Sequence, residues 1–162
     1  MTDTDYMNRV EAMERRLYRV SRAILWNDAD CADAIQEAVI KGWLKRDGLR
    51  NPEYFETWMT RVLINECRNI QRKNRVRLLP AEDARLPAPE AAADPADNMM
   101  LGDLLGKLPA KYRTVLVLHH LEGFSLEEMA SLLNLPQTTV KARLHQARKR
   151  LRDLLSTGDD CQ

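Results

Sequence analysis

Apolar residues recur at helical spacing through the first half of the chain. Steps of four, three and four residues predict a first helix that ends near Trp26. Its apolar face consists of Met13, Leu17, Val20 and Ile24. The acidic stretch at residues 28–30 breaks this pattern, and we expect a second helix to open at Asp33. The apolar residues of that helix are Ile35, Val39 and Trp43.

A loop separates these helices from a longer third one. Residues 45–52 include Gly48 and Pro52, and both residue types interrupt helices. The third helix is expected from about Glu53 to Arg75. Its apolar stripe consists of Phe55, Trp58, Met59, Val62 and Leu63. The rings of Phe55 and Trp58 are predicted to lie in the core.

Helical periodicity is lost between Leu79 and Asn98. This stretch holds four prolines, five acids and an alanine run, and it has no apolar face. We therefore predict an extended, flexible linker at residues 79–98. The linker would divide the chain into an N-terminal domain at 1–78 and a C-terminal domain at 99–157.

The C-terminal half has the pattern of a small helical bundle. A leucine-rich segment stops at Pro109, and the next helix runs from Lys111 until Gly123 ends it. Ser125 and Glu128 then form a capping-box pattern, in which each side chain can satisfy the other's free backbone N–H. A short helix, a tight turn at residues 134–136 and a final helix follow. Their apolar residues are Leu126, Met129, Ala130 and Leu133, then Val140, Leu144, Ala147, Leu151 and Leu154.

The predicted fold class is all-α, with two small helical domains joined by the linker. The formal net charge is only +1, but the charges are segregated. Residues 61–77 carry six basic side chains against one acid, Glu66, and residues 141–152 carry six with no acid. Two basic patches can bind a polyanion although the whole chain is nearly neutral.

Composition and motifs argue against several other classes of protein. The three cysteines are odd in number and widely spaced, so we expect thiols in a reducing compartment and no metal site. We expect no cofactor and no enzyme, because the adjacent His119 and His120 do not form a zinc pair and no phosphate-binding glycine loop is present. Without a long apolar run or a signal pattern, a cytoplasmic protein is predicted.

The capped short helix, the turn and the basic final helix together predict a helix-turn-helix. In this motif the second helix enters the DNA major groove. Lys and Arg can bind phosphates or guanine edges, and Thr, Gln and His can exchange hydrogen bonds with either. A solvated amphipathic face is the alternative for this helix. The predicted contact residues are Thr138, Thr139, Lys141, Ala142, Arg143, His145, Gln146 and Arg148.

These motifs resemble, across nearly the whole chain, the extracytoplasmic-function group of bacterial sigma factors. The segments LPAKYRTVLVL at 108–118, EGFSLEEMA at 122–130 and TVKARLHQAR at 139–148 resemble sigma region 4. The segments DCADAIQE at 30–37 and FETWMTRVLIN at 55–65 resemble region 2. Many repressors share a helix-turn-helix, but both halves in this order are a far more specific pattern.

The resemblance implies that region 2 opens and captures the promoter −10 element. Asn65 and Asn69 lie one helical turn apart, and an amide suits a base edge. An Asn in this helix could also cap a break or face solvent. The implied −10 residues are Arg61, Asn65, Arg68, Asn69, Arg72 and Lys73. The loop where relatives bind a flipped base corresponds to Arg46, Gly48, Leu49, Arg50 and Asn51.

The resemblance also implies a set of partners. Asp30, Asp33, Gln36 and Glu37 match the family's surface for RNA polymerase, although Asp33 could instead cap a helix N-terminus. The implied partners are core RNA polymerase, promoter DNA and an anti-sigma factor, often membrane-anchored, with the chain a monomer when free. The acidic linker would run through the polymerase near the RNA path.

A few positions depart from the family pattern. Val39 replaces a frequent Phe, Ala142 replaces a common Ser, and His145 and Gln146 stand at variable positions. The resemblance implies that region 4 reads the promoter −35 element as a duplex, and these departures leave the sequence of that element open. A stand-alone helix-turn-helix regulator is the main alternative, but it gives no reason for the N-terminal asparagine and acidic patterns. A sigma-mimicking antagonist is disfavoured by the basic helices.

Overall fold

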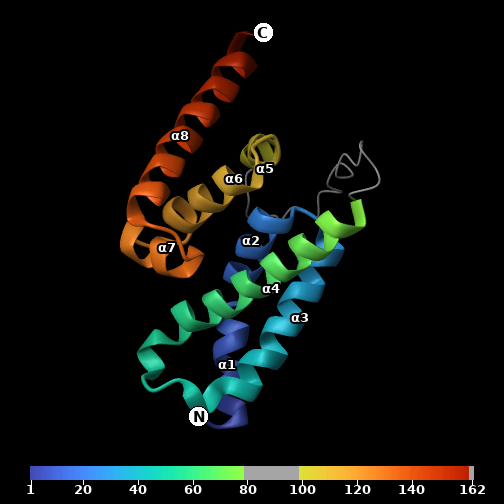
Figure 1. Ribbon diagram of the computed structural model, residues 1–162, viewed down its shortest axis with the longest axis vertical. Coiled ribbons are helices and arrows are strands. Elements are labelled where there is room, and N and C mark those ends of the chain that lie inside the picture. The colour runs from blue at the N-terminus through green and yellow to red at the C-terminus, as the bar shows by residue number, and fades with distance from the viewer. Residues whose placement is uncertain (79–98, 161–162) are drawn as a thin grey trace. The chain divides into compact units, whose positions relative to one another are not determined.

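The computed structural model describes residues 1–78 and 99–160, which form helices and short turns without a strand (Figure 1). This confirms the predicted all-α class. The chain divides into two compact units, Met1–Ala88 and Pro89–Gln162, and each is described here by itself. The predicted linker at residues 79–98 lies outside the described residues. Among the described helices, none is long and apolar enough to cross a membrane.

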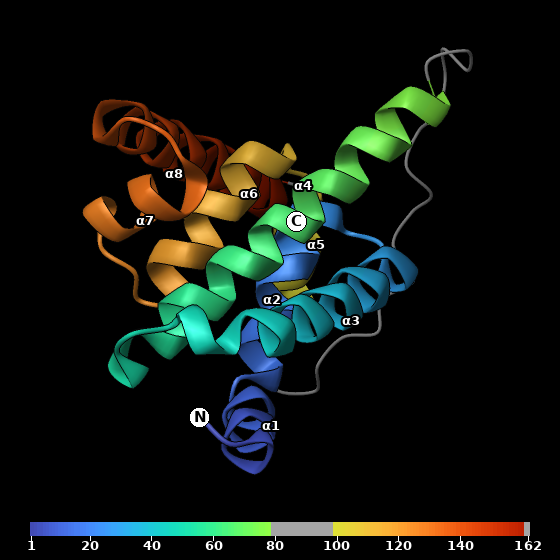
Figure 2. The same ribbon diagram turned by 60° about the horizontal axis from the view of Figure 1, so that its bottom comes forward.

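The first unit is built from four helices. They are α1 (Asp3–Ala12), α2 (Glu14–Leu25), α3 (Asp28–Lys45) and α4 (Phe55–Leu78). Helices α2, α3 and α4 pack against one another, and α3 and α4 lie side by side in both views (Figures 1 and 2). The end of α2 confirms the predicted stop, because Trp26 adopts the left-handed conformation that terminates helices. The sequence pattern did not predict α1.

The start of α3 differs from the prediction. The helix begins at Asp28, and the side chain of Asn27 caps it by accepting a hydrogen bond from the Asp30 backbone N–H at 3.0 Å. Acids at 28 and 30 therefore lie in the first turn, where the positive end of the helix dipole favours them. The acidic stretch starts a helix and does not break one. The alternative that Asp33 caps this helix is wrong.

The buried face of α3 also differs from the predicted stripe. Its buried residues are Cys31, Ala34, Ala38 and Gly42. Ile35 and Val39 are half-buried and Trp43 is exposed. Small side chains at a helix contact shorten the distance between helix axes, so α3 can pack closely against α2 and α4.

Helix α4 largely follows its predicted stripe. Phe55, Met59 and Leu63 are fully buried, whereas Trp58 and Val62 are half-buried. The helix starts at Phe55, after a 3₁₀ turn at Pro52–Tyr54. It also buries Ile64 and Cys67, which the stripe omitted. Burial raises the pKa of the Cys67 thiol far above its ordinary value, and it raises that of Cys31 as well, so both remain protonated, weakly reactive thiols.

The second unit consists of α5 (Met99–Gly106), α6 (Ala110–Leu116), α7 (Leu126–Leu133) and α8 (Gln137–Asp160). A π-helical turn at Val117–Leu121 prolongs α6, which confirms the predicted helix up to residue 121. Gly123 then takes φ +75°, a backbone conformation that glycine adopts without steric cost. His119, half-buried, donates from Nδ1 to the Phe124 carbonyl at 2.9 Å and closes this turn.

Candidate nucleic-acid interface

Helices α7 and α8 form the predicted helix-turn-helix. Ser125 Oγ accepts from the Glu128 N–H and Glu128 Oε1 accepts from the Ser125 N–H, both at 3.1 Å, which confirms the capping box. Asn134 ends α7 in the left-handed conformation, which Asn tolerates better than most residues. These local features fix where α7 starts and stops, and so they fix where α8 begins.

The buried side of α8 determines which side chains face outward. Val140, Leu144 and Ala147 are buried against the rest of the unit, as predicted. Six of the eight predicted contact residues are exposed, whereas Thr139 and Arg143 are half-buried. The exposed six are Thr138, Lys141, Ala142, His145, Gln146 and Arg148. Over its first turns α8 therefore presents cations and hydrogen-bonding groups without an intervening acid.

Arg148 is the predicted contact residue that has a partner inside the second unit. Its Nε donates to His120 Nε2 at 3.2 Å. Burial, the charge of Arg148 and the neighbouring His119 all lower the pKa of His120. A neutral imidazole can accept this hydrogen bond, whereas a protonated ring would repel the guanidinium. His120 thus supports Arg148 on the outer face.

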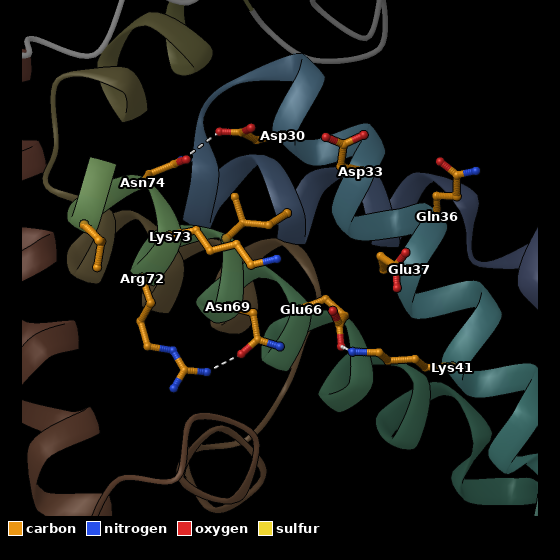
Figure 3. A pocket seen from close by; sticks show the side chains of 12 residues that line it. Asp30, Asp33, Gln36, Glu37, Lys41, Glu66, Asn69, Arg72, Lys73 and Asn74 are labelled. Atoms are coloured by element: carbon orange, nitrogen blue, oxygen red, sulfur yellow. Dashed lines mark hydrogen bonds and ion pairs between the residues drawn. The ribbon is translucent and has the colours of Figure 1, made fainter. Parts of the chain in front are cut away.

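In the first unit, a groove runs between α3 and α4 (Figure 3). The α3 side is mostly acidic and the α4 side carries amides and cations, as Figure 3 shows. The α3 residues are Asp30, Asp33, Gln36, Glu37 and Lys41. The α4 residues include Glu66, Asn69, Arg72, Lys73 and Asn74. The groove therefore brings all four predicted polymerase-binding residues beside three of the six predicted −10 residues.

Specific contacts tie the two sides of the groove together. Asn74 donates to Asp30 Oδ2 at 2.9 Å, and Lys41 Nζ donates to Glu66 Oε1 at 2.6 Å. The Glu66 side chain is only 10% exposed, and a carboxylate this buried needs a charged partner. The hydrogen bond to Glu66 raises the pKa of Lys41. Along α4, Arg72 donates a hydrogen bond to Asn69 Oδ1.

The remaining −10 residues lie on the same helix but outside the groove. Arg61 and Asn65 are exposed, and Arg68 is half-buried. Spacings of three and four residues from Arg61 through Asn65 to Asn69 and Arg72 place these side chains along one stripe of α4. The predicted set is therefore continuous on the helix surface, and only its C-terminal part meets α3.

The loop between α3 and α4 divides its five predicted residues between two roles. Arg46 donates to the Trp43 carbonyl at 2.7 Å and its guanidinium stacks 4.5 Å above the Trp43 ring. Asn51 Oδ1 accepts from the Glu53 N–H at 3.0 Å and caps the following 3₁₀ turn. Gly48 and Arg50 are exposed and Leu49 is half-buried. The two ends of the loop thus support its structure, and its middle is accessible.

The same two halves are found in known proteins. The model for sigma-70 region 2 matches residues 9–77, and the model for sigma-70 region 4 matches residues 98–151. The RNA polymerase sigma-E factor of Streptomyces avermitilis is 32% identical over 155 residues, covering 93% of this chain and 84% of that protein. The ECF RNA polymerase sigma factor SigW of Bacillus subtilis is 31% identical, covering 90% and 86%. The chain belongs to the extracytoplasmic-function sigma factors.

A solved structure agrees with the fold of this sigma factor. The sigma factor RpoE of Bartonella quintana, in complex with the anti-sigma factor NepR, has a TM-score of 0.75 and 24% identity. It covers 94% of this chain and 97% of that one. The first unit of the sigma factor contains region 2 and the second contains region 4. Sigma factors direct RNA polymerase to promoters, so the function expected from the resemblance is confirmed, and a stand-alone regulator is not supported.

Sequence reasoning missed several residues that shape this sigma factor's surface. Lys41 and Asn74 were not predicted, although they bind Glu66 and Asp30 across the groove. Glu66 stood out in the sequence as the lone acid among six cations, and this was the one available signal. The partners lie 25 and 44 residues apart along the chain, a separation at which helical periodicity gives no information.

Proposed function

We propose that the two units of this sigma factor divide promoter recognition between duplex and single-stranded DNA. Helix α8 of the second unit reads the −35 element as a duplex, and α4 of the first unit captures the −10 strand after it is opened. The observation that carries this proposal is the contrast between two polar helix faces. Over its first turns the face of α8 is exposed and free of acids, whereas the C-terminal part of the α4 face lines a groove opposite the acids of α3.

The α8 face suits a major groove, which is wide enough to admit one α-helix. Lys141 and Arg143 can form paired hydrogen bonds with guanine, and Gln146 can do the same with adenine. The buried residues Val140 and Leu144 hold the helix at a fixed rotation, so the same side chains always face the DNA. Arg148, supported by His120, is positioned to contact a phosphate.

The α4 face suits an unpaired strand. Opening a duplex and unstacking a base costs a few kcal/mol, which contacts to the exposed base must offset. Asn65 and Asn69 each offer donors and an acceptor to a base edge, and Arg61, Arg68, Arg72 and Lys73 can follow the phosphates. The exposed middle of the 46–51 loop, with Gly48 and Arg50, would receive a flipped base.

The acidic side of the groove suits the polymerase. Asp33, Gln36 and Glu37 are exposed on α3, on the opposite side of the groove from the cations of α4. Asp30 is half-buried and bound to Asn74, so it would act mainly by fixing α4 beside this surface. One rigid pair of helices could then join the polymerase to the captured strand. An anti-sigma factor is the further expected partner, since the structurally similar RpoE has one.

In vitro transcription tests this proposal. The full chain would be mixed with a bacterial core RNA polymerase and a promoter library randomised around −35 and −10, and the selected start sites sequenced. We expect enrichment of two separate motifs, and loss of the −10 motif when Asn69 and Lys73 are both replaced by Ala. Replacement of the exposed Lys107 by Ala is the control. Failure of the polymerase to select any start site would contradict the proposal.

A further inference from the structure

The loop between α3 and α4 is held at both ends by α1. At its start, Asp3 Oδ1 accepts from an Arg46 guanidinium nitrogen at 2.9 Å and from Trp43 Nε1 at 3.1 Å. At its end, a guanidinium nitrogen of Arg9 donates to the Pro52 carbonyl at 3.2 Å. Figure 1 shows the start of α1 beside the end of α3. Two polar side chains of one helix therefore bracket residues 46–52.

Helix α1 is itself fixed to the core of the first unit. Tyr6, between the two bracketing residues, is fully buried and donates to the Val39 carbonyl at 2.6 Å. Its ring also packs edge-on against Phe55 at 5.8 Å. Gly42 makes room for it, because a Cβ at that position would lie 2.5 Å from the Tyr6 hydroxyl. The bracket thus rests on a rigid support and not on a loose terminus.

This arrangement gives Arg46, at the start of the loop, a structural role. The Arg46 side chain is 21% exposed, stacked on Trp43 and paired with Asp3. The neighbouring Arg50 is exposed in the middle of the loop, next to Leu49. Of the two arginines, Arg50 is therefore the one available to a phosphate or base, and Arg46 serves to hold the loop in place.

We propose that α1 is a clamp for the strand-capturing loop, and that Asp3 and Arg9 are positioning residues for the flipped base. This inference rests on the proposed function of the loop. A loop that must order itself on binding loses conformational entropy at that moment, which weakens binding. A loop already held at residues 46 and 52 avoids most of this loss. Neither Asp3 nor Arg9 needs to touch DNA for the clamp to act.

The test uses holoenzyme and a labelled single-stranded DNA 12-mer that covers the −10 region of the promoter selected above. The double variant Asp3→Asn and Arg9→Gln should bind this strand about three- to tenfold more weakly, because the loop must then be ordered on binding. The matched control is the double variant Glu11→Gln and Arg15→Gln, which makes the same charge changes at exposed positions nearby. The single variant Asp3→Glu, which keeps the carboxylate, should bind the strand with most of the parent's affinity. Binding to core polymerase should change less than twofold in every variant.

Two further outcomes separate the clamp from the function of the loop. If Arg50→Ala weakens strand binding while the Asp3 and Arg9 variant matches its control, the clamp is wrong and the loop assignment stands. If Arg50→Ala also leaves strand binding unchanged, the loop does not bind the base and the clamp has nothing to position. Equal losses of strand binding and core binding would indicate an unfolded first unit, and would also overturn the clamp.

Discussion

The polar faces of the two units differ in how many of their side chains already contact other residues of the same unit. In the first unit, Asn69 is held by Arg72, Asp30 by Asn74 and Arg46 by Asp3. On α8, no hydrogen bond or ion pair with another part of the described chain engages the side chains of Lys141, Arg143, His145 or Gln146. Arg148, bound to His120, is the exception among the predicted contact residues of α8.

This difference matches two different tasks. Duplex DNA supplies an ordered array of donors and acceptors, so a rigid helix with unbound side chains is enough to read it. A single strand is flexible, and the protein must supply the order. Prearranged side chains reduce the entropy lost when a strand binds. Under the proposed division of tasks, region 4 therefore needs only a fixed helix to read a duplex, whereas region 2 needs prearranged side chains to bind a single strand.

The largest expected effect is on transcription and comes from the outer face of α8, where the side chains of Lys141 and Arg143 have no partners within the described chain. Replacing both Lys141 and Arg143 by Ala should lower transcription from the selected promoter by about ten- to a hundredfold, because a paired base contact contributes about 1–3 kcal/mol. On a promoter whose −35 element is scrambled, variant and parent should be equal. Lys107→Ala is the control. An equal loss on both promoters would show that these residues contact only phosphates.

The next effect is on the stability of the first unit, through the packing of Tyr6 against Gly42. Gly42→Val should destabilise this unit by about 1–3 kcal/mol, because the new side chain meets the buried Tyr6 hydroxyl. All three tryptophans, Trp26, Trp43 and Trp58, lie in this unit, so urea unfolding followed by tryptophan fluorescence reports on it alone. Gly48→Val, where nothing lies within 4 Å of an added Cβ, is the control. An unchanged midpoint in Gly42→Val would rule out close packing at Tyr6.

A smaller effect is expected in the second unit. Ser125→Ala removes the α7 cap and should cost about 1 kcal/mol. Backbone hydrogen exchange of α7 and α8 should become faster, while the tryptophan transition stays in place. Ser125→Asp, which keeps a capping oxygen, should recover most of the protection, and the exposed Ser156 serves for a control substitution to Ala. Movement of the tryptophan transition would mean that the units do not unfold separately.

The smallest effect is a pH dependence from His120. Because its pKa is lowered in the folded state, the unfolded chain binds this proton more readily. Neutral His120 therefore makes its full contribution to the free energy of unfolding above the ordinary pKa of about 6.5. That contribution is lost as the pH falls below this value. The loss of stability would be measured by thermal unfolding of the second unit in buffers from about pH 7.5 down to about pH 5, in steps of about half a pH unit. His120→Gln should flatten the decline, with His145→Gln as the control; an identical slope in His120→Gln would contradict this role.

The predictable parts of the molecule were those set by local chemistry. The capping box at Ser125, the turn at Asn134 and the buried side of α8 follow from spacings within a few residues, so the sequence predicted the whole helix-turn-helix. The start of α3 also has a local cause, the Asn27 cap, but the acids at 28 and 30 that follow it are equally typical of a break between helices. Acids suit both turns and first helical turns, and only the cap distinguishes them.

The groove and the clamp could not be predicted from spacing. The Asp30–Asn74, Lys41–Glu66 and Asp3–Arg46 contacts join residues from different helices, far apart in the chain. The buried face of α3 was missed for a related reason. Its larger side chains at Ile40 and Leu44 are exposed, because the small residues are needed where α4 packs. Such choices depend on which helix lies opposite.

The division of labour between the units is tested most directly by permanganate reactivity of the −10 thymines in holoenzyme complexes, with promoter occupancy measured in parallel. Asn65→Ala should lower this reactivity by about tenfold, roughly the loss of one base contact, while occupancy of the closed complex is retained. The exposed Asn8→Ala is the control. Unchanged thymine reactivity in Asn65→Ala, or a parallel loss of occupancy, would contradict the assignment of strand capture to α4.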